Sequence, residues 1–158
     1  EVMQYIYALG GFDGERCSRD VCIFSPDAVP TTRVAKNGRQ MLCARDGAAS
    51  AYANGHLIAF GGHDGSTIQT SCEVFTAGAP DHGRFQTWTE IRPMSTCRMM
   101  HCATPFEDLA GPTFLVFGGQ GSQTGVAGDY GTAPPRKSST LDTAEWLDLS
   151  SGVWTAGP

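Results

Sequence analysis

The sequence predicts an all-β protein made of about three repeated, four-stranded antiparallel units. One observation is the glycine content, 20 of 158 residues, without a collagen-like period. Average usage is about 7%, and an excess of this kind indicates tight turns and close backbone packing. The other observation is a repeated pattern: the apolar runs 5–11, 56–62 and 113–119 each close with two glycines. Because their final glycines are 51 and 57 residues apart, the period is that of a repeated β unit.

Composition and charge exclude several classes of protein. The length of 158 residues predicts one domain. The net charge is −5, and no basic run is longer than Arg136-Lys137, so we expect neither a nucleic-acid partner nor an anionic membrane surface. No stretch approaches the length of a membrane span, and the first residues lack the features of a signal peptide. The sequence therefore predicts a cytoplasmic protein without membrane insertion.

Six cysteines make disulfides arithmetically possible. The chain is longer than the small secreted scaffolds that need such cross-links, so we expect reduced thiols. A local disulfide between Cys17 and Cys22, which are five residues apart, is the alternative in an oxidising compartment.

Each unit is predicted to contain four strands. The runs that end in Gly-Gly are second strands, and the first strand of the second and third units begins at Arg45 or Arg98, after Met41 or Met94. Third strands are expected at 20–24, 71–75 and 144–149, and fourth strands with Trp88 and Trp154 at 86–90 and 152–155.

Two turns distinguish the second unit from the third. Asn54-Gly55 lies between two apolar alternating runs, and this dipeptide is a strong signal for a two-residue hairpin because a type I′ turn needs positive φ at both positions. The third unit has four extra residues here, which we assign to a longer turn around 105–112.

These residues resemble the kelch repeat, whose blades carry a Met-x-x-x-Arg lead-in, a second strand ending in Gly-Gly, an aromatic-plus-acid third strand and a tryptophan in the fourth. The resemblance implies a kelch-type β-propeller segment with blades at about 1–40, 41–93 and 94–158. The first blade departs from the pattern, because nothing between Pro26 and Gln40 is aromatic, and its fourth strand is placed near 32–34. Residues 120–139 are predicted to be a flexible insertion in the third blade.

Three blades are not enough to close a ring, which typically has about 4 to 8. Exposed sheet edges and faces would remain. We therefore expect the ring to be completed by further blades of a longer chain or by another subunit, and the first of these is favoured.

The loops that follow the Gly-Gly pairs are the predicted binding site, because loops on a rigid scaffold are a usual place for recognition. In kelch-type propellers such loops line one rim. The alternative is that these residues are solvated turn residues chosen for geometry. The candidate binding residues are Asp13, Glu15, Arg16, His63, Asp64, Ser66, Gln120 and Ser122.

Other candidate sites are weaker. A repeated arginine could bind a carboxylate ligand, but its fixed place in each unit favours a structural role for Arg45 and Arg98. Cys97, His101 and Cys102 form half of a zinc site at most, so no metal and no cofactor are expected. The glycine-rich run 119–125 lacks the lysine of a phosphate-binding loop, and no nucleophile elbow is present.

The sequence thus predicts a protein-interaction module, a scaffold or adaptor that binds a protein partner through its rim loops. The rival functions are a kelch-type enzyme acting on a sugar or other small molecule, and carbohydrate binding without catalysis. No catalytic set can be assembled for the enzyme, and we expect the tryptophans needed for sugar binding to pack between blades instead.

Overall fold

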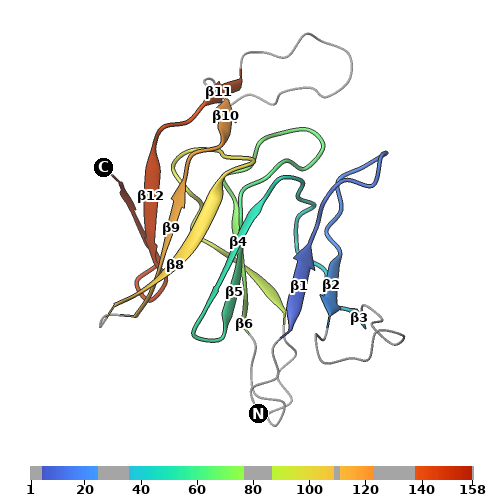
Figure 1. The fold of residues 1–158 in the computed structure, drawn as a ribbon, viewed down its shortest axis with the longest axis horizontal. Helices are drawn as coiled ribbons and strands as arrows, with labels where there is room; N and C mark the ends of the chain where they lie inside the picture. The colour runs from blue at the N-terminus through green and yellow to red at the C-terminus, as the bar shows by residue number, and fades with distance from the viewer. Residues whose placement is uncertain (1–4, 25–35, 77–86, 109–110, 123–137, 158) are drawn as a thin grey trace.

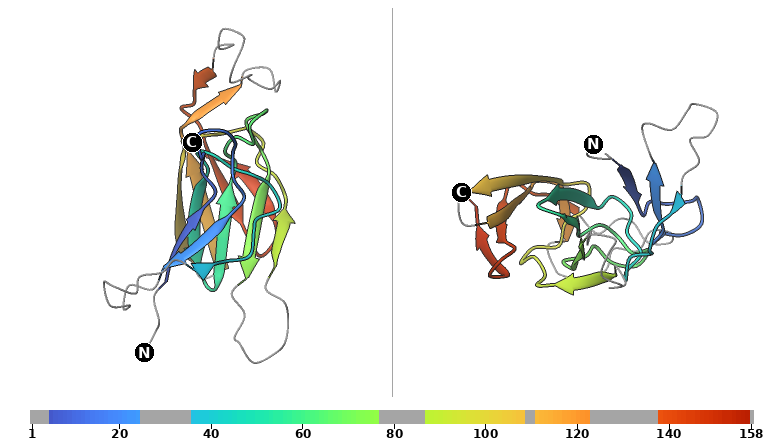
Figure 2. Two further views of the ribbon diagram at one scale, coloured as in Figure 1. Left: turned by 90° about the vertical axis from the view of Figure 1, so that its right-hand side faces the viewer. Right: turned by 90° about the horizontal axis from the view of Figure 1, so that it is seen from below.

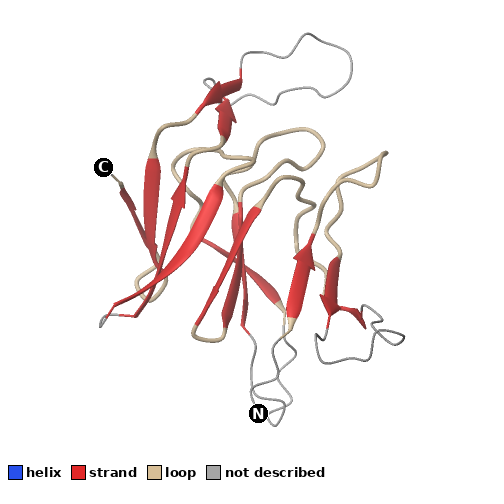
Figure 3. Cartoon of the chain, in the orientation of Figure 1, coloured by secondary structure: helices blue, strands red, loops and turns tan. Residues whose placement is uncertain are grey.

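The computed structural model describes residues 5–24, 36–76, 87–108, 111–122 and 138–157. Strands are the only regular elements in this part of the chain, and it contains no helix (Figure 3). None of the described segments is a helix that could cross a membrane. The strands are β1 (Ile6–Leu9), β2 (Val21–Phe24), β3 (Lys36–Asn37), β4 (Ala49–Ala53), β5 (His56–Phe60), β6 (Cys72–Thr76), β7 (Trp88–Ile91), β8 (Cys102–Asp108), β9 (Gly111–Phe117), β10 (Gln120–Ser122), β11 (Ser138–Thr140), β12 (Ala144–Asp148) and β13 (Val153–Ala156).

The strands form three antiparallel sheets that follow one another along the chain (Figure 1). The first sheet has the order β1-β2-β3, the second β4-β5-β6-β7, and the third β8-β9-β12-β13. A separate two-stranded ladder, β10-β11, lies in the connection between β9 and β12. Figure 2 shows the three sheets side by side without closing into a ring. The predicted fold class, an open series of propeller-type blades, is confirmed.

The registers show that the three sheets repeat one unit. Leu9 pairs with Val21, Phe60 with Cys72 and Phe117 with Ala144, in each case where the second strand reaches its two glycines. Because side chains alternate along a strand, these pairings assign every residue to one of two faces. We call the face toward the preceding sheet the front face and the opposite one the back face.

The cores lie between the sheets. The back face of the second sheet, with Ile58, Phe60 and Val74, packs against the front face of the third, with Phe114 and Leu147. The rings of Phe60 and Phe114 are 6.0 Å apart, within the range of favourable aromatic pairs. A second cluster joins the back face of the first sheet to the front face of the second. Its members are Tyr7, Leu9, Val21, Ile23, Met41, Leu57, Ala59, Phe75 and Trp88.

Several predicted elements are confirmed. The second strands β1 and β5 lie within the Gly-Gly runs, and β9 begins two residues before its run. The expected third and fourth strands of the second and third sheets lie within two residues of their predicted positions. Asn54 and Gly55 have φ values of 49° and 80°, as the hairpin prediction required.

The predicted start of the first strands is wrong. β4 and β8 begin at Ala49 and Cys102, beyond Arg45 and Arg98. The two arginines stand instead in the segments 41–48 and 94–101, which we call lead-in segments, and their side chains are fully buried. The backbone of Arg45 does not join the ladder of its own sheet, because its N–H donates to the carbonyl of Ser18 and its carbonyl accepts the N–H of Gly11, both beside the first sheet.

The extra residues of the third unit lengthen its strands rather than its turn. β8 and β9 run through Pro105 and Pro112, and the pairing continues to Asp108 and Gly111. Pro105 is tolerated because β8 is an edge strand, where a missing N–H donor breaks no ladder.

The prediction that 120–139 is a flexible insertion is wrong at both ends of the segment. Gln120–Ser122 and Ser138–Thr140 pair as β10 and β11, so the glycine-rich run begins in a strand. Residues 123–137, like the predicted fourth strand at 32–34 of the first blade, lie outside the described residues. The described third strand of the first sheet is β3, at Lys36–Asn37.

Candidate binding rim

The candidate site lies at the end of the sheets where the second strands reach their glycine pairs, uppermost in Figure 1. We call this end the Gly-Gly rim. It contains the loops that follow the glycine pairs and the two lead-in segments, which cross from one sheet to the next.

Arg45 connects the lead-in segment to the second sheet. Its Nη1 donates to the carbonyls of Gly61 at 2.6 Å and Ser71 at 2.9 Å. Its Nε and Nη2 donate to Glu73 Oε1 at 3.0 and 2.9 Å. The same carboxylate accepts the backbone N–H groups of Leu42 and Cys43, at 2.6 and 3.0 Å. The buried charges are therefore paired and hydrogen-bonded, which burial requires.

The third sheet repeats this arrangement. Arg98 donates to the carbonyls of Gly118 and Thr143 at 3.0 and 2.8 Å, and its Nη2 lies 3.3 Å from Glu145 Oε1. Glu145 in turn accepts the backbone N–H of Ser95 at 2.7 Å. The structural interpretation of the repeated arginine is thus confirmed, and neither guanidinium faces a ligand.

The glycine pairs are needed because the next lead-in segment passes over them. The backbone N–H of Gly62 donates to the carbonyl of Arg98 at 2.8 Å. A Cβ on Gly61 would collide with that same carbonyl, and both glycines have positive φ. Only glycine allows this conformation and this approach together.

Asp13 and Asp64 each fix the loop in which they stand. Asp13 Oδ1 accepts the N–H groups of Glu15 and Arg16, both at 2.8 Å. Asp64 Oδ1 accepts those of Ser66 and Thr67, both at 2.7 Å. Burial opposes ionisation of Asp64, but these hydrogen bonds hold its pKa below the ordinary value. Both aspartates therefore give their loops a defined shape.

The other predicted binding residues differ in their surroundings. Glu15, Arg16 and Ser66 are exposed, and Arg16, with a side chain 85% exposed, is 3.6 Å from Asp13. His63 is buried instead, and its Nδ1 accepts the N–H of Gly65 at 3.0 Å. The remaining two, Gln120 and Ser122, lie in β10, and Gln120 is bridged to the lead-in residue Met99.

Sequence reasoning missed two exposed apolar residues on the rim. Phe12 stands in the first loop at the position that His63 and Gln120 hold in the others, and it is exposed. Met100 is also exposed and has φ 54°, an uncommon value for a residue with a side chain. An alignment of the lead-in segments on Arg45 and Arg98 places Met100 opposite Gly47, so it could have indicated the positive φ of Met100 but not its exposure.

Negative charge gathers between the first two loops. Burial, followed by the carboxylates of Asp46, Asp64 and Asp13, raises the pKa of the Cys17 thiol. The two loops are close together here, because a Cβ added to Gly65 in the second loop would lie 3.9 Å from the Sγ of Cys17 in the first. All six cysteines are free thiols, so the alternative of a Cys17–Cys22 disulfide is not realised. The loops of the first and second sheets thus lie beside one another, with the carboxylates of Asp13, Asp46 and Asp64 near Cys17.

The residues weighed as half of a zinc site do not converge on one position. His101 is buried while Cys102 is exposed. No group of three potential ligand side chains is gathered anywhere in the described part of the chain.

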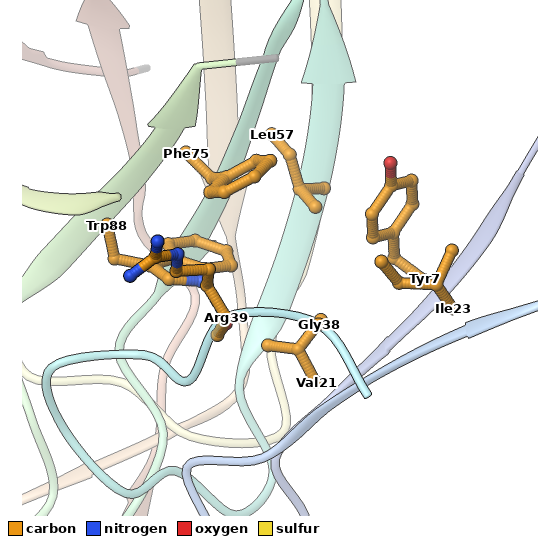
Figure 4. Close-up of a pocket in the computed structure, with 8 residues that line it drawn as sticks. All are labelled: Tyr7, Val21, Ile23, Gly38, Arg39, Leu57, Phe75 and Trp88. Carbon is orange, nitrogen blue, oxygen red and sulfur yellow. The ribbon is translucent and has the colours of Figure 1, made fainter. Parts of the chain in front are cut away.

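Trp88 and Trp154 pack between sheets, as expected. Trp88 is buried against Phe75, with rings 5.5 Å apart, and its Nε1 donates to the carbonyl of Arg39 at 2.9 Å. A cavity of about 10 Å³ lies beside it, lined from the first and second sheets (Figure 4). Small-molecule sites occupy about 300–1,000 Å³, so this gap is an imperfection of packing and not a sugar site.

Comparison with protein families identifies the repeat. Residues 44–95, which contain Arg45, the glycine pair, Glu73 and Trp88, match the kelch motif. The second sheet is a kelch repeat. No match to the chain was found among curated proteins. Kelch motifs are typical of interaction propellers, so the kelch assignment supports binding as the general role of this chain.

Proposed function

We propose that this kelch-repeat chain is a scaffold or adaptor that binds a protein partner through the Gly-Gly rim. The observation that supports this proposal is the contrast between the base of the rim and its loops. The base is fixed by buried ion pairs at Arg45 and Arg98, while Arg16, Phe12 and Met100 above it are exposed. Exposed loop residues held on a rigid scaffold lose little conformational entropy on binding.

The proposed contact residues divide by role. Glu15, Arg16 and Ser66 contact the partner directly, joined by Phe12 and Met100 as apolar anchors. Asp13, His63 and Asp64 hold the loops in shape through their hydrogen bonds. Gln120 and Ser122 extend the surface along β10. Aromatic and methionine side chains are enriched at protein interfaces, which favours a protein over a small molecule as the partner.

The charges on the rim favour a partner with a basic surface. Asp13, Asp46 and Asp64 lie close enough to Cys17 to shift its pKa together. Complementary charge chiefly speeds association and excludes partners of like charge. We place this complex in the cytoplasm, where the free thiols would persist. The proposed role is non-enzymatic.

The test is affinity purification from source-cell extract with the chain as bait, in wild-type and two variant forms. The rim variant is Glu15→Ala/Arg16→Ala/Ser66→Tyr. The control is Glu90→Ala/Arg92→Ala, which removes the same charges from the outer edge of the second sheet, where both residues are exposed.

We expect a protein to be retained by the wild type and the control, with retention by the rim variant reduced about tenfold or more, equivalent to about 1.4 kcal/mol. Chemical cross-linking should join the retained protein to the chain near residues 12–16 and 63–67. Equal retention by both variants, or recovery of small molecules alone, would rule out the proposal.

A further inference from the structure

Among the described residues, those on the back face of the third sheet are largely apolar, and several of them are exposed. Phe106, Phe117 and Val153 are among the most exposed large hydrophobic residues, and Phe106 and Trp146 form an edge-to-face pair with ring centres 6.1 Å apart. The registers place Leu115 opposite Trp146 on the same face. Contiguous apolar surface of this kind marks an interaction site in a folded protein.

The repeat shows what this face is built to contact. Phe117 occupies the position of Phe60 in the second sheet, where the register and the following glycine pair are the same. Phe117 is 41% exposed, whereas Phe60 is 0% exposed because the front face of the third sheet covers it. Phe114 and Trp154 supply that cover, with ring centres 6.0 and 6.1 Å from Phe60. The surface that fits over Phe117 is therefore the front face of another such sheet.

In the described part of the chain, the front face of the first sheet is exposed. On the first sheet, Ile6 and Phe24 pair with one another, and Ala8 pairs with Cys22. In the repeat, Ile6 and Phe24 hold the positions of Phe114 and Leu147 in the third sheet. Ala8 and Cys22 hold those of Val116 and Glu145. Ile6 is 61% exposed, and Ala8 and Phe24 are exposed as well.

We propose that two copies of the chain associate head to tail. The back face of the third sheet of each copy packs on the front face of the first sheet of the other, and the two chains close one ring of six sheets. A heterologous contact closes a ring when its rotation allows, and six blades lie within the usual range of about 4 to 8. This contact continues the interfaces already present between neighbouring sheets, and it is separate from the Gly-Gly rim.

Cys22 favours a second copy over another repeat of the same type before the first sheet. Glu73 and Glu145 each neutralise the arginine of the lead-in segment that passes over their sheet. The first sheet has a thiol at this position, so the arginine of a lead-in segment like 41–48 or 94–101 passing over this sheet would be buried without a carboxylate, which is strongly unfavourable. The back face of the third sheet meets Cys22 with uncharged side chains at its centre.

The experiment measures the mass of the 158-residue chain in solution by light scattering after gel filtration, over a range of concentrations. We expect twice the chain mass. Phe117→Glu and Ile6→Glu each place a charge on one of the two faces and should each give a monomer. Phe12→Glu is the matched control on an exposed aromatic residue of the rim and should remain a dimer. Circular dichroism and urea unfolding of each variant check that the sheets are retained.

Mixing the two single variants distinguishes head-to-tail contact from other arrangements. Each ring contains two equal contacts, and a mixture of Phe117→Glu and Ile6→Glu can restore one of them, so a weaker heterodimer should form. A dimer that survives Ile6→Glu would mean that two third sheets pack on each other, and it would overturn the proposal. A monomer at all concentrations, or an open series of oligomers, would also overturn it.

The cysteines give an independent measurement. Cys22 and Cys102 lie on the two faces, whereas Cys43 lies in the lead-in segment. We expect alkylation of both Cys22 and Cys102 to slow at least tenfold as the concentration rises through the association range, with Cys43 unchanged. Unaltered rates at Cys22 and Cys102 would contradict the contact.

Discussion

Arg45 and Glu73 form an ion pair with an N–O distance of 2.9 Å and side-chain exposures of 0% and 1%. Arg45 binds the Gly61 carbonyl of its own sheet, and its own carbonyl accepts the N–H of Gly11 in the preceding sheet at 2.8 Å. One residue therefore joins two sheets. Because each kelch unit meets the same packing problem, the pair recurs as Arg98 and Glu145.

Removal of this arginine should destabilise the protein strongly. We expect Arg45→Met to lower the free energy of unfolding by about 3–5 kcal/mol, since Glu73 would remain buried without its partner. The double variant Arg45→Met/Glu73→Leu should lose less free energy of unfolding than Arg45→Met alone. Arg16→Ala, which removes only the exposed pair with Asp13, should change stability by less than about 1 kcal/mol. Urea unfolding of the four proteins provides the measurement, and equal losses for the two Arg45 variants would contradict the explanation.

The two glycines Gly61 and Gly118 hold the same place in the repeat but should differ in their tolerance of alanine. Both have positive φ, 54° and 68°. Only at Gly61 would a Cβ meet a backbone carbonyl of the next lead-in segment, whereas the nearest atom to a Cβ on Gly118 is 3.9 Å away. We expect Gly118→Ala to cost about 1 kcal/mol and Gly61→Ala about 1–3 kcal/mol more. Equal costs in thermal unfolding would show that only the φ value matters.

His101 should make stability depend on pH between about 4 and 6.5. Burial, and then the charge of Arg98, lowers its pKa from 6.5 to about 4. The unfolded chain takes up the proton first, so the free energy of unfolding falls as the pH drops through this window, by up to about 3 kcal/mol. The second repeat has Ala48 at this position, so His101→Ala is a matched variant that should fold and lose this dependence. Parallel stability curves for the two proteins would disprove the assignment.

Cys72 should be inert in the folded protein. Its side chain is buried, and burial is the main cause that raises its pKa to about 12. Because the thiolate is the reactive form, alkylation at pH 8 should reach Cys72 only in the unfolded state. Peptide mapping after a pulse of iodoacetamide should show labelling of Cys72 that rises with urea along the unfolding curve. Labelling in the native protein would mean local opening of β6.

The order of strands could be predicted from the sequence because it depends on local chemistry. The pair Gly61-Gly62 permits positive φ, the dipeptide Asn54-Gly55 favours a two-residue turn, and the apolar run that ends at Phe60 favours a strand, and each of these signals is local. The places where prediction was wrong depend on partners distant in the chain. β4 begins after Arg45 because the backbone of Arg45 bonds to Ser18 and Gly11, and no signal near residue 45 indicates these partners.

The candidate site divides in the same way. Asp13 and Asp64 could be chosen from the sequence because Asp-Gly turns are local. The burial of His63 and the exposure of Met100 could not, since both depend on how the lead-in segments cross the rim. The sequence also does not show that Phe117 is exposed whereas Phe60, which has the same position in the repeat, is buried.

The sequence by itself determined that this chain is a series of kelch-type blades, because repeated turns and alternation act within a few residues. The tertiary structure alone decided which charged groups are buried in pairs, which rim residues are exposed and which sheet faces stay open. Burial depends on how the sheets pack together. The residues that meet in this packing lie about 30 to 60 positions apart in the chain, as in the hydrogen bonds of Arg45 to Glu73 and of Trp154 to Arg92.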